Sequence, residues 1–185
     1  MEPDGVLIEQ SAHGRPDAFV EVARRHEVAV HGYLARRAGG QAADDLLAEV
    51  WLRAFAAREG YDTAYGDAGP WLYGIARNVL REHRRACNGD VPAAIGETRI
   101  DPWDGIDDRL DAAGRAKAVV AAVRALPAAE REVLLLVAWE QLSPAEAAQV
   151  LGLPQGTVRS RLHRARARLR LVLNERDAEA AEVST

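Results

Sequence analysis

The sequence has few residues that could form a disulfide or bind a metal ion, because Cys87 is its only cysteine. A single thiol excludes an intramolecular disulfide framework. His83 lies four residues before Cys87, but two ligands do not make a structural zinc site and no second pair follows. We therefore expect neither a metal ion nor a cofactor.

Long apolar runs are also lacking. No stretch approaches the ~18 apolar residues that are needed to span a membrane. The acidic start, MEPDGVLIEQSAHG, does not contain the apolar core of a signal peptide. These two absences predict a cytoplasmic protein without a membrane span.

Aromatic residues make up 5% of the chain, and Lys117 is the only lysine. Alanine dominates the 48% of residues that are hydrophobic, a composition that favours helices packed on helices over a β-sheet. Nearly all of the positive charge is therefore arginine, which reflects a coding bias or serves contacts with phosphate and guanine. Counting residues does not separate these two explanations.

Helical periodicity is lost over one long stretch, NGDVPAAIGETRIDPWDGIDD, which carries six acids against one base. We interpret it as an acidic linker between two small domains. The sequence thus predicts an all-α protein with an N-terminal tail at 1–15, a helical domain at 16–87, the linker at 88–108, a second helical domain at 109–173 and a C-terminal tail at 174–185.

A helix-turn-helix is predicted in the second domain. SPAE is the pattern of a capping box, with Ser143 as N-cap, Pro144 in the first helical position and Glu146 in the third. A short helix follows and ends at Gly152, and another begins near Pro154. Two helices joined by such a tight turn are typical of DNA-binding domains.

The last predicted helix contains GTVRSRLHRARARLR, which has six arginines and no acid in a chain of net charge -4. On a helical wheel its apolar residues face the core: Val158, Leu162, Ala165 and Leu169. The opposite face carries Ser160, His163 and Arg164, and it is flanked by Arg159, Arg161, Arg166 and Arg168. A helix whose charges serve only solubility would mix acidic residues with these basic ones. The pattern therefore favours a recognition helix in a major groove.

A second basic face is present in the first domain, in WLYGIARNVLREHRR. Arg77, Asn78 and Arg81 lie on one side of this predicted helix, and Trp71 stands at its start beside a glycine-rich loop. Basic residues beside aromatic rings suit the binding of single-stranded DNA with an unstacked nucleobase. A solvated helix with its aromatic residues in the core fits equally well, and the pattern alone leaves both interpretations open.

These segments, in this order, resemble the extracytoplasmic-function (ECF) sigma factors of bacterial RNA polymerase. LPAAEREVLLLVAWEQLSPAEAAQVLGLPQGTVRSRLHRARARL is similar to their region four, whereas DAFVEVARRHEVAVHGYLARR, ADDLLAEVWLRAF and PWLYGIARNVLREHRR are similar to region two. One departure is Gln141, where the family often has glycine, and another is Pro144, where it often has tyrosine or a similar residue.

The resemblance implies roles for particular residues. Arg159, Ser160, His163 and Arg164 match positions that read the minus-thirty-five element, while Asn78 and the loop from Tyr61 to Pro70 match those that read the minus-ten element, with Arg77 and Arg81 as backbone contacts. Asp44, Asp45, Leu46 and Glu49 match the surface that docks on the polymerase, although acids there also complement a helix dipole. The implied partners are core RNA polymerase, through its beta and beta-prime subunits, promoter DNA and an anti-sigma factor.

Two other classes of function remain to be weighed. An autonomous helix-turn-helix regulator usually dimerises or carries a ligand-binding domain, and the first half offers a basic face in place of an obvious ligand pocket. An enzyme is disfavoured, because no phosphate-binding glycine loop and no nucleophile motif is found, so we expect no catalytic residue.

Overall fold

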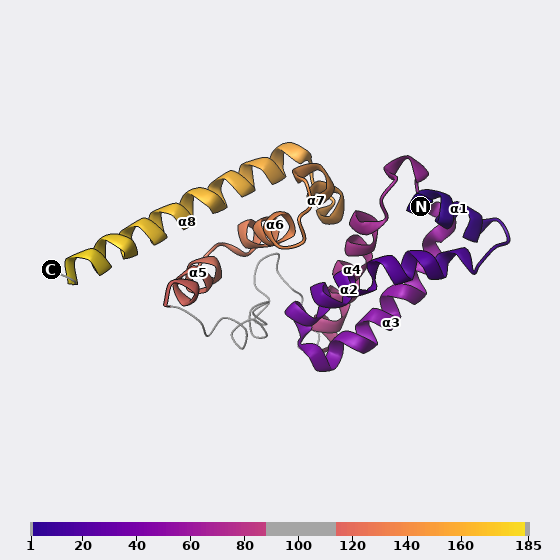
Figure 1. Cartoon of the computed structure of the whole chain (residues 1–185), viewed down its shortest axis with the longest axis horizontal. Coiled ribbons are helices and arrows are strands. Elements are labelled where there is room, and N and C mark those ends of the chain that lie inside the picture. Colours follow the sequence, from indigo (N-terminus) through magenta and orange to yellow (C-terminus); the bar gives the residue numbers. More distant parts are fainter. Residues whose placement is uncertain (1, 88–113, 184–185) are drawn as a thin grey trace. The chain divides into compact units, whose positions relative to one another are not determined.

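The computed structural model describes residues 2–87 and 114–183, and every regular element in these two stretches is a helix (Figure 1). The prediction of an all-α fold is therefore confirmed. The chain divides into two compact units; residues 2–87 are called the N-terminal half and residues 114–183 the C-terminal half. The predicted acidic linker at 88–108 lies outside the described residues.

The N-terminal half is a bundle of four α-helices with two 3₁₀ turns. Its elements are α1 (Asp4–Ala12), α2 (Ala18–Ala38), α3 (Gly40–Ala57), η1 (Arg58–Gly60), η2 (Thr63–Tyr65) and α4 (Gly69–Cys87). Helices α2, α3 and α4 pack against one another, and α1 packs on α2. Val22, Leu34, Val50 and Leu72 are fully buried between them. The sequence periodicity predicts three helices here, at about 16–38, 42–58 and 70–85, and α2, α3 and α4 begin and end close to these residues.

The prediction of a tail at 1–15 is wrong, because residues 4–12 form helix α1. Leu7, Ile8 and Ser11 of this helix are buried, with Ile8 only 1% exposed. Their spacing places them on one face of a helix, and that face packs on α2. The segment is short and polar on its other side, so its partners, rather than its own periodicity, hold it in place.

The C-terminal half contains α5 (Gly114–Arg124), α6 (Ala128–Ala138), α7 (Pro144–Leu151) and α8 (Gln155–Val183). Helix α8 packs on α5 and α6 through the predicted inner face, where Val158, Leu162 and Ala165 are buried. The prediction that the helix ends at 173 and a tail follows is wrong, because α8 continues to Val183. The added segment is rich in alanine and glutamate, which favour helix.

Local chemistry fixes the turn between α7 and α8. The Ser143 amide donates to the Glu146 carboxylate over 2.7 Å, and the Glu146 amide donates to the Ser143 hydroxyl over 3.2 Å. The predicted capping box is thereby confirmed. At the other end, Gly152 has a φ of +64°, and the Leu153 amide donates to the Ala148 carbonyl over 3.0 Å. This is the helix ending that a left-handed glycine permits, and it turns the chain into α8.

Candidate nucleic-acid interface

The outer surface of α8 has two edges that differ in their partners. Because successive residues turn by about 100°, four basic residues fall on one edge, which we call the free edge: Arg159, His163, Arg166 and Arg170. All four are exposed, and none of them forms an ion pair with a residue that the structure describes. Ser160 is exposed next to this edge. The free edge therefore presents three guanidiniums and an imidazole that are available to phosphate.

The opposite edge of α8 is tied to α6. The guanidinium Nε of Arg168 lies 3.0 Å from Glu130 Oε2, and that of Arg164 lies 3.3 Å from Glu130 Oε1. The Glu130 side chain is only 8% exposed, whereas both arginines remain about half exposed. Arg164 and Arg168, which the sequence places with the DNA-facing residues, thus already have an anionic partner within the protein.

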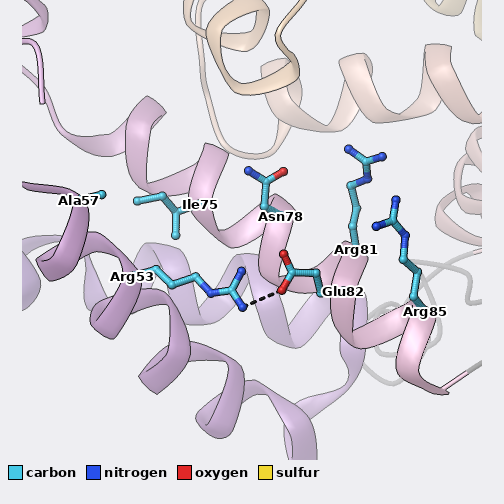
Figure 2. Close-up of a pocket in the computed structure, with 7 residues that line it drawn as sticks. All are labelled: Arg53, Ala57, Ile75, Asn78, Arg81, Glu82 and Arg85. Carbon is cyan, nitrogen blue, oxygen red and sulfur yellow. Dashed lines mark hydrogen bonds and ion pairs between the residues drawn. The ribbon is translucent and has the colours of Figure 1, made fainter. Parts of the chain in front are cut away.

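Helix α4 presents the second basic surface. This surface borders a pocket of about 280 Å³, which α3 also lines. Figure 2 shows the residues that line it: Arg53, Ala57, Ile75, Asn78, Arg81, Glu82 and Arg85. Asn78, Arg81 and Arg85 are exposed. The structure therefore brings together the predicted residues Asn78 and Arg81, so that an amide, three guanidiniums and the Glu82 carboxylate, which Arg53 binds, border one hollow. This is a donor-rich surface that suits a nucleotide backbone.

Trp71 and Arg77, the other two predicted residues of this site, do not line the pocket. Both are half-buried. The Trp71 ring packs edge-on against Tyr61 with 5.0 Å between the ring centroids. Burial, together with the nearby Asp4, Asp67 and Asp62 carboxylates, raises the pKa of Tyr61 to about 12. Trp71 thus anchors the loop between α3 and α4 to the start of α4.

The predicted docking residues on α3 are acidic at the surface and apolar beneath it. Asp44 and Asp45 are exposed, and the Asp44 carboxylate lies 3.1 Å from His31 Nε2 with its side chain 85% exposed. Leu46 is 7% exposed and belongs to the hydrophobic core. In the free chain the Leu46 side chain holds α3 in the bundle, while Asp44 and Asp45 face outward, and the contact of Leu46 with a partner stays a prediction.

Glu49, the remaining docking candidate, belongs to a row of three charges that we call the charge chain: Glu49, Arg53 and Glu82. Arg53 Nε donates to Glu49 Oε1 and its Nη2 donates to Glu82 Oε2, each over 2.6 Å, and Figure 2 shows the second bond. These two bonds raise the pKa of Arg53, and the bond from Arg53 lowers the pKa of Glu82. The charge chain joins α3 to the basic surface of α4.

One group of side chains in the described residues has the composition of a metal site. Single ligand atoms of Asp4, His26 and Asp67 all lie within 4.8 Å of one another. However, Asp4 Oδ2 is 2.5 Å from His26 Nε2, a direct hydrogen bond, and the Arg25 guanidinium binds Asp4 Oδ1. A guanidinium on the same carboxylate opposes a second cation, so we interpret the group as a hydrogen-bonded network.

Sequence reasoning misses Asp4, Glu130, Arg53 and Glu82. Apart from the i,i+4 pair of Glu49 and Arg53 on α3, the partners of these residues lie on other elements, so no spacing in the sequence connects them. One signal was available for Asp4, since it follows Pro3 and precedes the apolar pair Leu7 and Ile8, as at the start of an amphipathic helix. No comparable signal exists for Glu130.

Two family models match this chain. The model for Sigma-70 region 2 matches residues 22–88, and that for Sigma-70, region 4 matches residues 116–169. The RNA polymerase sigma factor CarQ of Myxococcus xanthus is 31% identical over 94% of this chain and 99% of its own length. The ECF RNA polymerase sigma factor SigL of Mycobacterium tuberculosis is 31% identical over 81% of this chain and 85% of its own length. The chain belongs to the ECF sigma factors of RNA polymerase.

Further relatives agree with this assignment. The ECF sigma factor BldN of Streptomyces coelicolor is 33% identical over 86% of this chain, which spans 61% of the length of BldN. Among solved structures, CnrH in complex with the cytosolic domain of CnrY aligns over 93% of this chain and 97% of its own, with a TM-score of 0.64 and 28% identity. RpoE of Bartonella quintana, solved with the anti-sigma factor NepR, aligns with a TM-score of 0.58 at 22% identity and supports the fold.

The family assignment gives the function at the level of the whole chain. A sigma factor binds core RNA polymerase and directs promoter-specific initiation of transcription, and it contributes binding rather than a catalytic step. No helix in the described residues is both long and apolar enough to cross a membrane.

Proposed function

We propose that this sigma factor reads the upstream promoter element with α8 and the downstream element with α4. The observation that carries the proposal is the separation of charge: two basic surfaces stand on separate halves, and two adjacent exposed acids, Asp44 and Asp45, stand on α3. Arg159, Ser160, His163 and Arg166 serve the upstream contact, with Arg161 at the margin and Arg164 and Arg168 on the edge that Glu130 shares. Flanking guanidiniums meet phosphates, while the central side chains face base edges.

The downstream element is assigned to the surface around the α4 pocket. Asn78 and Arg81 stand at its rim, Arg77 lies beside them on α4, and Trp71 fixes the loop from Tyr61 to Pro70. An amide and a guanidinium at one hollow can bind an unpaired base and its backbone together. This division of labour assigns duplex DNA to the C-terminal half and opened DNA to the N-terminal half.

The acidic surface of α3 is assigned to the polymerase. Asp44, Asp45 and Glu49 would repel DNA phosphates but attract and orient a basic helix of the beta-prime subunit, with the beta subunit as a further contact. Two structural relatives were solved with a regulatory partner, CnrH with the cytosolic domain of CnrY and RpoE with the anti-sigma factor NepR. An anti-sigma factor is accordingly a proposed partner here, and the cytoplasm, where the polymerase works, is the proposed location.

Charge reversal on α3 tests this assignment. We expect Asp44→Arg with Asp45→Arg to weaken binding to core polymerase and to remove promoter-directed transcription, because both carboxylates are exposed and would become repulsive. Glu49 is left unchanged, since its reversal would oppose Arg53 and disturb the charge chain. The measurement is a pull-down with core polymerase, followed by run-off transcription.

Glu59→Arg is the control, because Glu59 is an exposed acid in η1, which follows the other end of α3. It changes the net charge in the same direction and should leave polymerase binding intact. A double variant that melts like the wild type and still binds polymerase with full strength would contradict the docking assignment.

A further inference from the structure

The N-terminal helix α1 carries a buried carboxylate with three partners. Asp4 is 8% exposed. Its Oδ1 lies 2.9 Å from Arg25 Nη1, and its Oδ2 lies 2.5 Å from His26 Nε2 on the same helix, α2. The third partner comes from a distant part of the chain, since the Ala68 amide donates to Oδ2 over 3.2 Å. Asp4 thus connects α1, α2 and the residue that precedes α4.

The Ala68 bond lies at the end of the loop that is assigned to the downstream element. Ala68 is fully buried and acts as the N-cap of α4, because its carbonyl accepts the first helical bond, from the Leu72 amide at 2.9 Å. The next amide, that of Gly69, donates to Asp67 Oδ1 over 2.8 Å. Two carboxylates therefore bind the amides at the start of α4, where the positive end of the helix dipole stabilises negative charge.

A second contact joins α1 to the middle of the same loop. A Cβ placed on Gly5 would lie 3.1 Å from the Thr63 carbonyl oxygen in η2. Glycine therefore allows α1 to approach the η2 backbone more closely than another residue would. Arg25 also donates to the Glu2 carbonyl over 2.7 Å, which fixes the chain just before α1. The loop between α3 and α4 is held at two points by a helix far from it in the sequence.

The charge state of Asp4 agrees with this arrangement. Burial alone would raise its pKa, but hydrogen bonds from His26, the Ala68 amide and Arg25 outweigh burial, and the pKa lies below its ordinary value. Stability from Asp4 is therefore present above the unfolded pKa of about 4 and is lost as the pH falls through the lower folded value. At neutral pH the carboxylate is charged and its bonds are intact.

We propose that Asp4 is a positioning residue for promoter recognition: through Asp4 and Gly5, helix α1 holds the loop from Tyr61 to Pro70 and the start of α4 in the conformation that binds the downstream element. The inference rests on the proposed function of that loop. Asp4 itself is buried under Arg25 and His26 and touches no DNA. Without it the loop loses an anchor, while α8 and the upstream contact are unchanged.

Hydrogen exchange on the free chain gives the first test, and it does not depend on any DNA. In Asp4→Ala we expect faster exchange at Ala68, Gly69 and residues 61–66, with the cores of α2 and α3 as protected as in the wild type. Glu9→Gln is the matched control, because Glu9 is an exposed acid on the same helix. Exchange that is unchanged in Asp4→Ala, or that rises across the whole N-terminal half, would overturn the proposal.

Binding of the reconstituted holoenzyme gives the second test. The probes are a fork-junction DNA with an unpaired downstream element and a duplex that carries only the upstream element. We expect Asp4→Ala to weaken fork binding by about tenfold or more, the factor that the loss of one hydrogen bond to a charged group commonly causes, and to change duplex binding by less than about twofold. Equal losses on both probes, or no loss on the fork, would overturn the proposal.

Gly5→Val keeps the test decisive if Asp4→Ala does not fold. Its side chain pushes on Thr63 but leaves every charge in place, so selective loss of fork binding is again expected, and wild-type fork binding would count against the proposal. Failure of the proposed function has a different signature: the wild-type holoenzyme would then show no preference for the downstream base, while the exchange result would still decide whether Asp4 holds the loop.

Discussion

Glu130 is buried beneath two arginines that the helical wheel places on the outer surface of α8. The wheel locates Arg164 and Arg168 correctly in angle, but it says nothing of what stands beside the helix. A buried carboxylate needs charged or hydrogen-bonding partners, and both guanidiniums supply them while remaining half exposed. Glu130 and DNA phosphate can therefore compete for the same two arginines.

This competition predicts the effect of Glu130→Gln, which keeps the shape of the side chain and removes its charge. We expect the holoenzyme to bind duplex DNA more tightly at low salt, because two guanidiniums are released to phosphates. The slope of log affinity against log salt should steepen by up to about 1.8, since each added phosphate contact contributes about 0.9. Discrimination between promoter and non-promoter DNA should fall, because phosphate contacts carry no sequence information.

Glu132→Gln is the control for this measurement. It removes one acid from the same helix, and at two residues along the helix its side chain points away from that of Glu130 by about 200°. The net charge changes equally in both variants. The same steepening in both would show a general charge effect and would contradict a specific role for Glu130.

At the scale of elements, the sequence predicts best where a local rule decides the structure. The capping box at Ser143 and Glu146 and the turn at Gly152 depend on neighbouring residues, and the structure shows both. The sequence does not predict helix α1, because the partners of Asp4 lie on α2 and just before α4. The sequence does not predict the end of α8 for another reason: the segment after 173 has no apolar period in its sequence, but polarity does not prevent a helix.

The connection between α6 and α7 contains a residue in an unfavourable conformation. Gln141 has a φ of +57°, in the left-handed region that costs a side-chain-bearing residue about 1 kcal/mol. This is the position where the family often has glycine. We expect Gln141→Gly to stabilise the C-terminal half by up to about 1 kcal/mol, less the greater chain entropy of glycine when unfolded. Thermal unfolding followed by circular dichroism measures it.

The same substitution elsewhere provides the control. Gln149 is exposed within α7, so Gln149→Gly should destabilise the protein by about 0.5–1 kcal/mol through lost helix propensity. Opposite signs for one chemical change would identify backbone conformation as the cause. A loss of stability in both variants would contradict the account of Gln141.

At the scale of the whole molecule, the sequence predicts two helical domains and two basic surfaces. Both predictions are possible because amphipathic periodicity and runs of like charge can be recognised directly in the order of the residues. It does not predict how the surfaces are joined to their surroundings. Leu46 stands among the docking candidates but is buried, and Arg53 connects two elements whose sequences show no relation. Such connections depend on the packing of α3 against α4, which only the folded chain displays.

The charge chain of Glu49, Arg53 and Glu82 has a thermodynamic consequence. When a polymerase cation engages Glu49, as proposed, Arg53 is left to neutralise Glu82, and less negative charge then faces phosphate beside Arg81 and Arg85. Polymerase binding should therefore raise the affinity of α4 for DNA. We expect fork DNA to tighten polymerase binding in the wild type and to do so less in Arg53→Gln, as measured by titration with and without DNA. An equal effect in both would exclude the charge chain as the link.

Linkage of this kind is reciprocal, since each ligand must alter the affinity of the other by the same factor. The promoter would then help to retain the sigma factor on the polymerase, and loss of the promoter would loosen it. Release after initiation would need no separate trigger, because leaving the downstream element is itself the step that weakens the hold on α3.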